Sequence, residues 1–177
     1  MEFLMRQNFD ACLSLTLLQE GGYVDNPKDP GGMTNLGVTK RVWQDYVKRE
    51  VDESEMRSLT PEAVAPLYRG MYWDAVRADS LPSGVDLVTF DCAVNAGPRQ
   101  AAKFLQRAAG VKDDGAIGPA TLEAVRGRDS KEMIESFSEQ RLNFLKALPT
   151  FSTFGKGWTR RVEEVKIEAL SCLQPSA

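Results

Sequence analysis

The 177-residue sequence contains no histidine. The side chain that most often moves protons near neutral pH is therefore missing, and acid–base chemistry would depend on carboxyl groups. Cysteine is scarce as well, because only Cys12, Cys92 and Cys172 occur and they lie far apart. An odd count without short spacings argues against a disulfide framework or a zinc site. We therefore expect a protein that uses neither a metal ion nor an organic cofactor.

Long apolar runs are also missing. No stretch approaches the ~20 apolar residues of a membrane-spanning helix, and the first residues lack the basic segment and apolar core of a secretory signal. We expect a monomer that is made in the cytoplasm, without a signal peptide or membrane insertion. The net charge is −3, with excess acid in residues 1–98 and excess base in residues 99–177. The absence of a strong basic patch argues against nucleic acid as a partner.

The sequence does contain an apolar helical stripe that ends in a carboxyl group. The stripe consists of Phe9, Leu13, Thr16, Leu17 and Glu20. This spacing places all five on one helix face, and Gly21 and Gly22 predict the end of the helix. The negative end of the helix dipole and the apolar neighbours both disfavour a charge on Glu20. Both effects favour the protonated form that a proton donor needs.

A turn-rich segment follows directly. Two short extended pieces flank a connection rich in proline and glycine, which predicts a small irregular hairpin. Asp29 and Thr34 are its most exposed polar candidates. Because Asp29-Pro30-Gly31 is also an ordinary turn sequence, Asp29 is either a turn former or a catalytic group.

These motifs resemble a known family. Glu20-Gly21-Gly22-Tyr23, followed by Asp29-Pro30-Gly31-Gly32-Met33-Thr34-Asn35-Leu36-Gly37-Val38-Thr39, is similar to glycoside hydrolase family 108. That family comprises peptidoglycan N-acetylmuramidases, among them phage endolysins and bacterial proteins once labelled secretion activators. The likeness continues through Tyr72-Trp73, Leu81-Pro82, Phe90 to Pro98, Leu105-Gln106 and Asp114 to Thr121. It therefore spans most of the chain.

The resemblance implies a mainly α (α+β), lysozyme-like fold with a small irregular β-hairpin beside the active site. Residues 1–98 would form the catalytic lobe, and residues 99–177 a helical, peptidoglycan-binding-like region packed on it. Glu20 matches the catalytic Glu of the family. The spacing from Glu20 to Asp29 and Thr34 is similar to the Glu, Asp, Thr constellation of phage lysozymes.

The implied reaction is hydrolysis of the β-1,4 bond between N-acetylmuramic acid and N-acetylglucosamine in peptidoglycan glycan strands. Glu20 would protonate the departing oxygen, and Asp29 with Thr34 would face the oxocarbenium centre, with Asp25 in reserve. Such an endolysin-like protein would reach the cell wall by holin-type release or dedicated export. Three alternatives remain open: a lytic transglycosylase, a non-catalytic peptidoglycan-binding protein, and a chitin or chitosan hydrolase.

Further residues have two interpretations each. Tyr23, Asn35 and Thr39 would orient the glycan or the loop itself. Trp73 is either a core residue or a platform for a sugar ring. Asp91 and Asn95 lie four residues apart, which places them on one helix face. They form either a buried pair or a cleft wall that binds sugar substituents. Arg141 stands in an otherwise apolar stripe that indicates core packing.

Overall fold

The mainly α fold with one small hairpin is confirmed. The computed structural model describes residues 2–25 and 32–173. The elements are α1 (Glu2–Glu20), β1 (Thr34–Asn35), β2 (Val38–Thr39), α2 (Lys40–Val47), α3 (Glu53–Arg57), α4 (Pro61–Tyr68), a π-helical turn (Arg69–Trp73), a 3₁₀ turn (Ala78–Ser80), α5 (Val85–Ala96), α6 (Pro98–Ala109), α7 (Pro119–Arg126), α8 (Ser130–Lys146) and α9 (Phe151–Ser171).

The predicted stripe of α1 is buried. Phe9, Leu13, Thr16 and Leu17 are all less than 9% exposed. Glu20 is the last residue of the helix, and Gly21 follows with a φ of 79°. The positive φ ends the helix at a position where any side chain would be strained. The apolar face of α1 therefore leads directly to the Glu20 carboxyl group.

The hairpin after α1 has two closures. Val24 pairs with Thr34 in an antiparallel bridge, which closes the Pro/Gly-rich connection as the sequence predicts. A second, tighter turn at Leu36 and Gly37 joins β1 to β2. These two turn residues have φ values of 49° and 73°, as a two-residue hairpin loop of the primed type requires. Gly37 thus sits at the tip of a turn that faces the end of α1.

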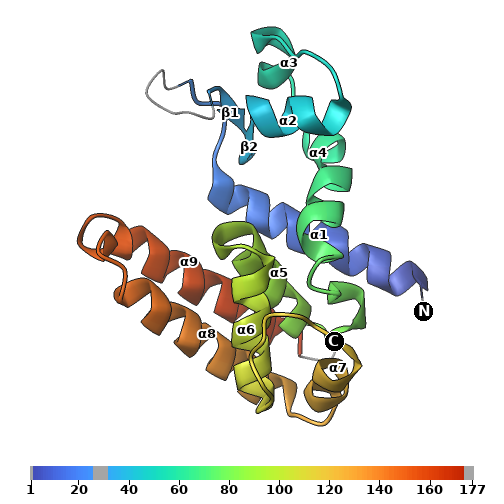
Figure 1. The fold of residues 1–177 in the computed structure, drawn as a ribbon, viewed down its shortest axis with the longest axis vertical. Helices are drawn as coiled ribbons and strands as arrows, with labels where there is room; N and C mark the ends of the chain where they lie inside the picture. The colour runs from blue at the N-terminus through green and yellow to red at the C-terminus, as the bar shows by residue number, and fades with distance from the viewer. Residues whose placement is uncertain (1, 26–31, 174–177) are drawn as a thin grey trace.

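Two groups of elements lie on either side of α1 (Figure 1). The hairpin, α2 and α3 lie above it, and α4 descends from them across α1. Helices α5 to α9 lie below, with α8 and α9 side by side and antiparallel. The Glu20 end of α1 points into the space between the hairpin and α9, so residues far apart in sequence meet there.

One apolar core runs through both groups, from Phe9 on α1 to Ala169 on α9. Helix α5 is at its centre, because nine of its twelve residues, Val85 to Ala93, are buried. A helix buried on every side needs partners all around it, and α1, α6, α8 and α9 supply them. The core crosses residue 98. The boundary between the two predicted regions at that residue stays a prediction.

The Asp114 to Thr121 segment is a loop fixed from inside. The Gln106 side chain is 1% exposed. Its Nε2 lies 2.9 Å from Asp114 Oδ1, 3.0 Å from Ala116 O and 3.2 Å from Thr121 Oγ1. Its Oε1 accepts from Gly115 N at 2.9 Å. The buried amide therefore holds the loop closed.

Candidate active site

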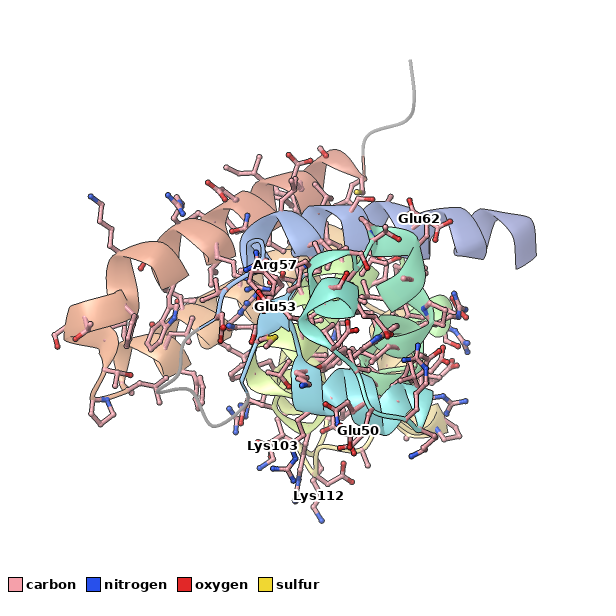
Figure 2. The ribbon with its side chains drawn as sticks, turned by 90° about the horizontal axis from the view of Figure 1, so that it is seen from above. Glu50, Glu53, Arg57, Glu62, Lys103 and Lys112 are labelled. Atoms are coloured by element: carbon pink, nitrogen blue, oxygen red, sulfur yellow. The ribbon has the colours of Figure 1, made fainter. Side chains whose placement is uncertain are left out.

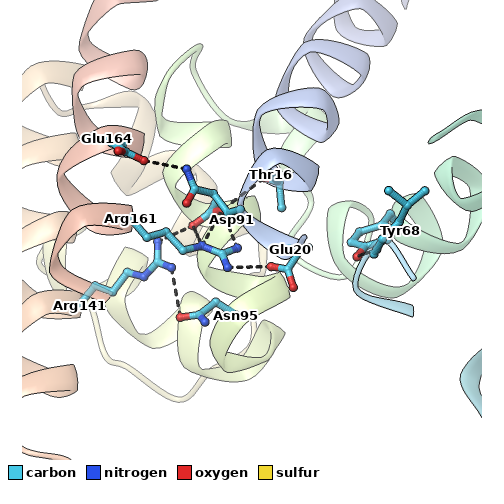
Figure 3. A network of polar contacts seen from close by, with 10 residues as sticks. Thr16, Glu20, Tyr68, Asp91, Asn95, Arg141, Arg161 and Glu164 are labelled. Carbon is cyan, nitrogen blue, oxygen red and sulfur yellow. Dashed lines mark hydrogen bonds and ion pairs between the residues drawn. The ribbon is translucent and has the colours of Figure 1, made fainter. Parts of the chain in front are cut away.

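The Glu20 carboxyl group is partly exposed and touches α9. Its side chain is 20% exposed, and Arg161 Nη1 lies 2.7 Å from Oε1 (Figure 3). Oε1 itself is buried and makes no aligned hydrogen bond among the residues that the structure describes. The contact is therefore an ion pair without hydrogen-bond geometry. The exposed area of the Glu20 side chain therefore belongs to atoms other than Oε1.

Asp91 on α5 sets the orientation of Arg161. Arg161 Nε lies 3.2 Å from both carboxylate oxygens of Asp91, and Nη2 donates to Oδ1 at 2.8 Å. Because Nε and Nη2 are engaged there, Nη1 is the nitrogen presented to Glu20. A fork-shaped guanidinium held in this way has little freedom to turn. Asp91 thus positions the cation that contacts Glu20.

A second arginine completes this network. Arg141 Nη1 on α8 donates to Asp91 Oδ2 at 2.7 Å, and its Nη2 donates to Asn95 Oδ1 at 3.2 Å. Thr16 Oγ1 on α1 lies 3.4 Å from Asp91 Oδ1. The Asp91 side chain is 0% exposed, so the prediction that it binds sugar is corrected: its oxygens are committed to the fold. Asn95 is exposed on the same helix face and stays a candidate.

The charges of this network are permanent. Burial alone would raise the pKa of Asp91, but the guanidinium groups of Arg141 and Arg161 hold that pKa below its ordinary value. Burial would lower the pKa of Arg161, but Asp91 and Glu20 hold it above its ordinary value. Asp91 therefore stays negative and Arg161 positive at every pH near neutrality.

The hairpin turn lies against the other side of Glu20. A Cβ atom at Gly37 would stand 3.0 Å from Glu20 Oε2 and 2.5 Å from Tyr68 Oη, so this approach requires glycine. Tyr68 Oη donates to Leu36 O at 2.7 Å, which fixes the turn. Burial, followed by the charge of Glu20, raises the pKa of both Tyr68 and Tyr72. Both phenols therefore remain neutral beside the carboxyl group.

Comparison with known proteins gives two family matches and a structural relative. Residues 13–97 match the family described as Glycosyl hydrolase 108. Residues 100–163 match the family described as Predicted Peptidoglycan domain. The solved structure of Brucella abortus SagA is 44% identical, with a TM-score of 0.83, and the match covers 97% of this chain and 98% of that chain. No curated protein sequence matches. This chain belongs to glycoside hydrolase family 108.

The resemblance stated from the sequence motifs is therefore confirmed, together with the lysozyme-like, mainly α fold. The family 108 chain is a glycoside hydrolase, and its second family match makes peptidoglycan the substrate class. Each family match contains one residue of the ion pair at the site, because Glu20 lies within the first matched region and Arg161 within the second. The candidate site thus draws on both halves of the chain.

Three residues predicted to contact substrate in this family 108 chain are instead held by the fold. Trp73 is 1% exposed and its indole N–H donates to Asp79, so it is a core residue, one of the two interpretations left open. Asn35 is buried and its amide donates to a main-chain oxygen of α3. Thr39 is the N-cap of α2. Asn35 and Thr39 thus fit the second of their two interpretations, in which they orient the loop itself, and Trp73 is not a sugar platform.

Tyr23 and the remaining predicted residues lie on the hairpin side. The Arg57 guanidinium lies 4.0 Å from the Tyr23 ring centroid, and Glu53 Oε1 lies 3.5 Å from the Tyr23 hydroxyl. Figure 2 shows Glu53 and Arg57 next to each other on α3. Tyr23 thus ties the segment after Glu20 to α3. Thr34 lies in β1, whereas Asp29 falls outside the described residues, so their pairing stays a prediction.

Sequence reasoning missed the cations of the site. Arg141 carried a signal, because a single arginine within an apolar helical stripe requires a buried anion as its partner. No such signal marked Arg161, because it lies in a helix with several other charged residues. Within residues 2–25 and 32–173, no cluster of acidic or sulfur side chains could hold a metal ion. In the same ranges, no helix has both the length and the apolar character of a membrane span.

Proposed function

We propose that this peptidoglycan hydrolase cleaves the β-1,4 bond between N-acetylmuramic acid and N-acetylglucosamine, with Glu20 as general acid. The supporting observation is one partly exposed carboxyl group, held between Arg161 and the hairpin turn at Gly37. It lies at the start of the region that matches the glycosidase family. An endolysin-like role after holin-type release or dedicated export belongs to the same proposal.

Glu20 donates its proton to the departing glycosidic oxygen. Negative charge then develops on the carboxyl group, and Arg161 Nη1, 2.7 Å from Oε1, stabilises that charge. Because Arg161 is anchored on Asp91 rather than on Glu20, protonation of Glu20 loses one contact and leaves the rest of the network intact. The site thus favours the change of charge that the reaction requires.

The group that faces the oxocarbenium centre is Asp29 together with Thr34, with Asp25 as second choice. Asp91 is not this group, because it is fully buried and bound by two arginines. Asp25 is exposed and follows Glu20 by one short segment. An Asp29→Asn variant that loses activity while Asp25→Asn retains it would support the first choice.

Mass spectrometry of fragments released from purified peptidoglycan tests the reaction. Wild type should release fragments with reducing muramic-acid ends, and Glu20→Gln should release at least a hundredfold fewer, in line with the loss of a general acid. Glu62→Gln is the matched control, since Glu62 is an exposed glutamate in the first turn of α4. It should cleave as wild type does.

Other products would overturn the proposal in distinct ways. Anhydro-muramic ends would make the enzyme a lytic transglycosylase. Reducing N-acetylglucosamine ends, or equal cleavage of chitin, would change the bond or the substrate. Binding to peptidoglycan without fragments from either protein would leave a non-catalytic binding protein. Full activity of Glu20→Gln would remove Glu20 from the mechanism.

A further inference from the structure

The first two turns of α9 carry aromatic side chains on a face that is buried farther along the helix. Farther along, this face is formed by Val162, Val165 and Ala169, all of them buried. In the first two turns it carries Phe151, Phe154 and Trp158, called the aromatic track below. Figures 1 and 2 show that this end of α9 projects beyond α1 and α5, with α8 beside it. The apolar face therefore continues past the point where the core covers it.

The aromatic track is a preformed surface. Phe154 is 53% exposed. Its ring centroid lies 5.7 Å from that of Trp158 at 31°, and Phe151 lies 6.3 Å from Trp158 at 51°. A Cβ atom at Gly155 would stand 2.7 Å from the Phe151 ring, so this glycine makes the space in which the ring packs. The rings are held against their own helix and against one another.

The aromatic track leads to the candidate acid. Arg161, which contacts Glu20, follows Trp158 by three residues and Phe154 by seven on the same side of α9. At 1.5 Å per residue, these steps correspond to about 4.5 Å and about 10 Å along the helix axis. The rings therefore lie within about two helical turns of the arginine that contacts Glu20.

We propose that the aromatic track binds the sugars of the same glycan strand, on one side of the cleaved bond. This inference rests on the proposed function. A pyranose ring presents C–H groups on its faces, which pack on flat aromatic rings, while the Trp158 indole also offers an N–H. The track also lies within the matched peptidoglycan region.

Binding of an inactive protein to insoluble peptidoglycan tests this inference separately from catalysis. In a Glu20→Gln background, Phe154→Ala and Trp158→Ala should each weaken binding to purified sacculi about 3- to 10-fold, the loss expected for one aromatic contact. Trp158→Phe, which keeps a ring, should restore most of the binding. The matched control is Ile167→Ala, because Ile167 is a large apolar residue on the same helix and is 61% exposed. It should bind as the parent does.

Two substrates distinguish which part of peptidoglycan the aromatic track binds. Phe154→Ala should weaken binding to glycan strands freed of peptide by an amidase as much as it weakens binding to sacculi. A loss on sacculi but none on peptide-free strands would assign the track to stem peptide and overturn the inference. Unchanged binding of Phe154→Ala and Trp158→Ala to both probes would overturn it too, whatever the cleavage assay shows. A wild-type dimer that Phe154→Ala converts to monomer would assign the track to a second copy.

Discussion

Replacing Arg161 by methionine should cost about 3 kcal/mol of stability. The Arg161 side chain is 11% exposed and that of its partner Asp91 is 0% exposed. Removing one member of a buried ion pair costs roughly 3–5 kcal/mol, because the remaining charge stays buried without compensation. Arg141 still lies 2.7 Å from Asp91, so we expect the lower end of that range. For a chain of this size, the Tm should fall by about 6–12 °C.

The adjacent arginine is the matched control. Arg160 is 73% exposed, and its Nε lies 3.8 Å from Glu164. An exposed pair of this kind contributes about 0–1 kcal/mol, so Arg160→Met should lower the Tm by no more than about 4 °C. Thermal unfolding followed by circular dichroism measures both variants without substrate.

The pH dependence distinguishes charge from packing. Because the pKa of Asp91 is below its ordinary value in the folded protein, its stabilising contribution is present above the unfolded pKa of about 3.9. The contribution is lost as the pH falls through the lower folded pKa. The gap in unfolding free energy between wild type and Arg161→Met should therefore narrow below about pH 4. An equal gap at pH 3 and pH 7, or a loss no larger than that of Arg160→Met, would refute the reasoning.

Two further predictions concern single positions. Gly37→Ala should lower kcat/KM at least tenfold, since a Cβ there meets the Glu20 carboxyl group at 3.0 Å. Gly32→Ala, at a similar φ of 70° with no atom within 4 Å, should lose far less. Burial raises the pKa of Asp86 to about 6, so its stabilising effect is present below the unfolded pKa and lost as the pH rises through about 6. In urea unfolding, the stability of Asp86→Asn relative to wild type should therefore rise by up to about 3 kcal/mol between pH 4 and pH 7. A difference in unfolding free energy that stays constant over this range would contradict the prediction.

Much of the local structure could be predicted from the sequence. The spacing of Phe9, Leu13 and Leu17 gives the buried face of α1, and Gly21 gives its end. These signals are local, because hydrophobic periodicity and positive φ depend on neighbouring residues. The hairpin followed from the same kind of evidence, although its tight turn at Leu36 and Gly37 was not predicted.

The predictions for individual side chains were less successful, for a common reason. Periodicity indicates that a residue is buried, but not which residue it meets. The Trp73 and Asn35 side chains have polar groups that suit either a glycan or the core, and only their contacts with Asp79 and with α3 decide between the two. Asp91 was recognised as a candidate, yet its partners lie on α8 and α9. The apolar stripe around Arg141 indicates a buried anion, but no local pattern shows that this anion is Asp91 or that Arg161 also binds it.

The sequence by itself determined the family, the helical scaffold and the carboxyl group at the end of α1. The tertiary structure decided what surrounds that carboxyl group. Glu20 meets Arg161 because α5 is buried on all sides and holds Asp91 where α1, α8 and α9 converge. A buried carboxylate requires cations at contact distance, and the packing of these helices determines which arginines supply them.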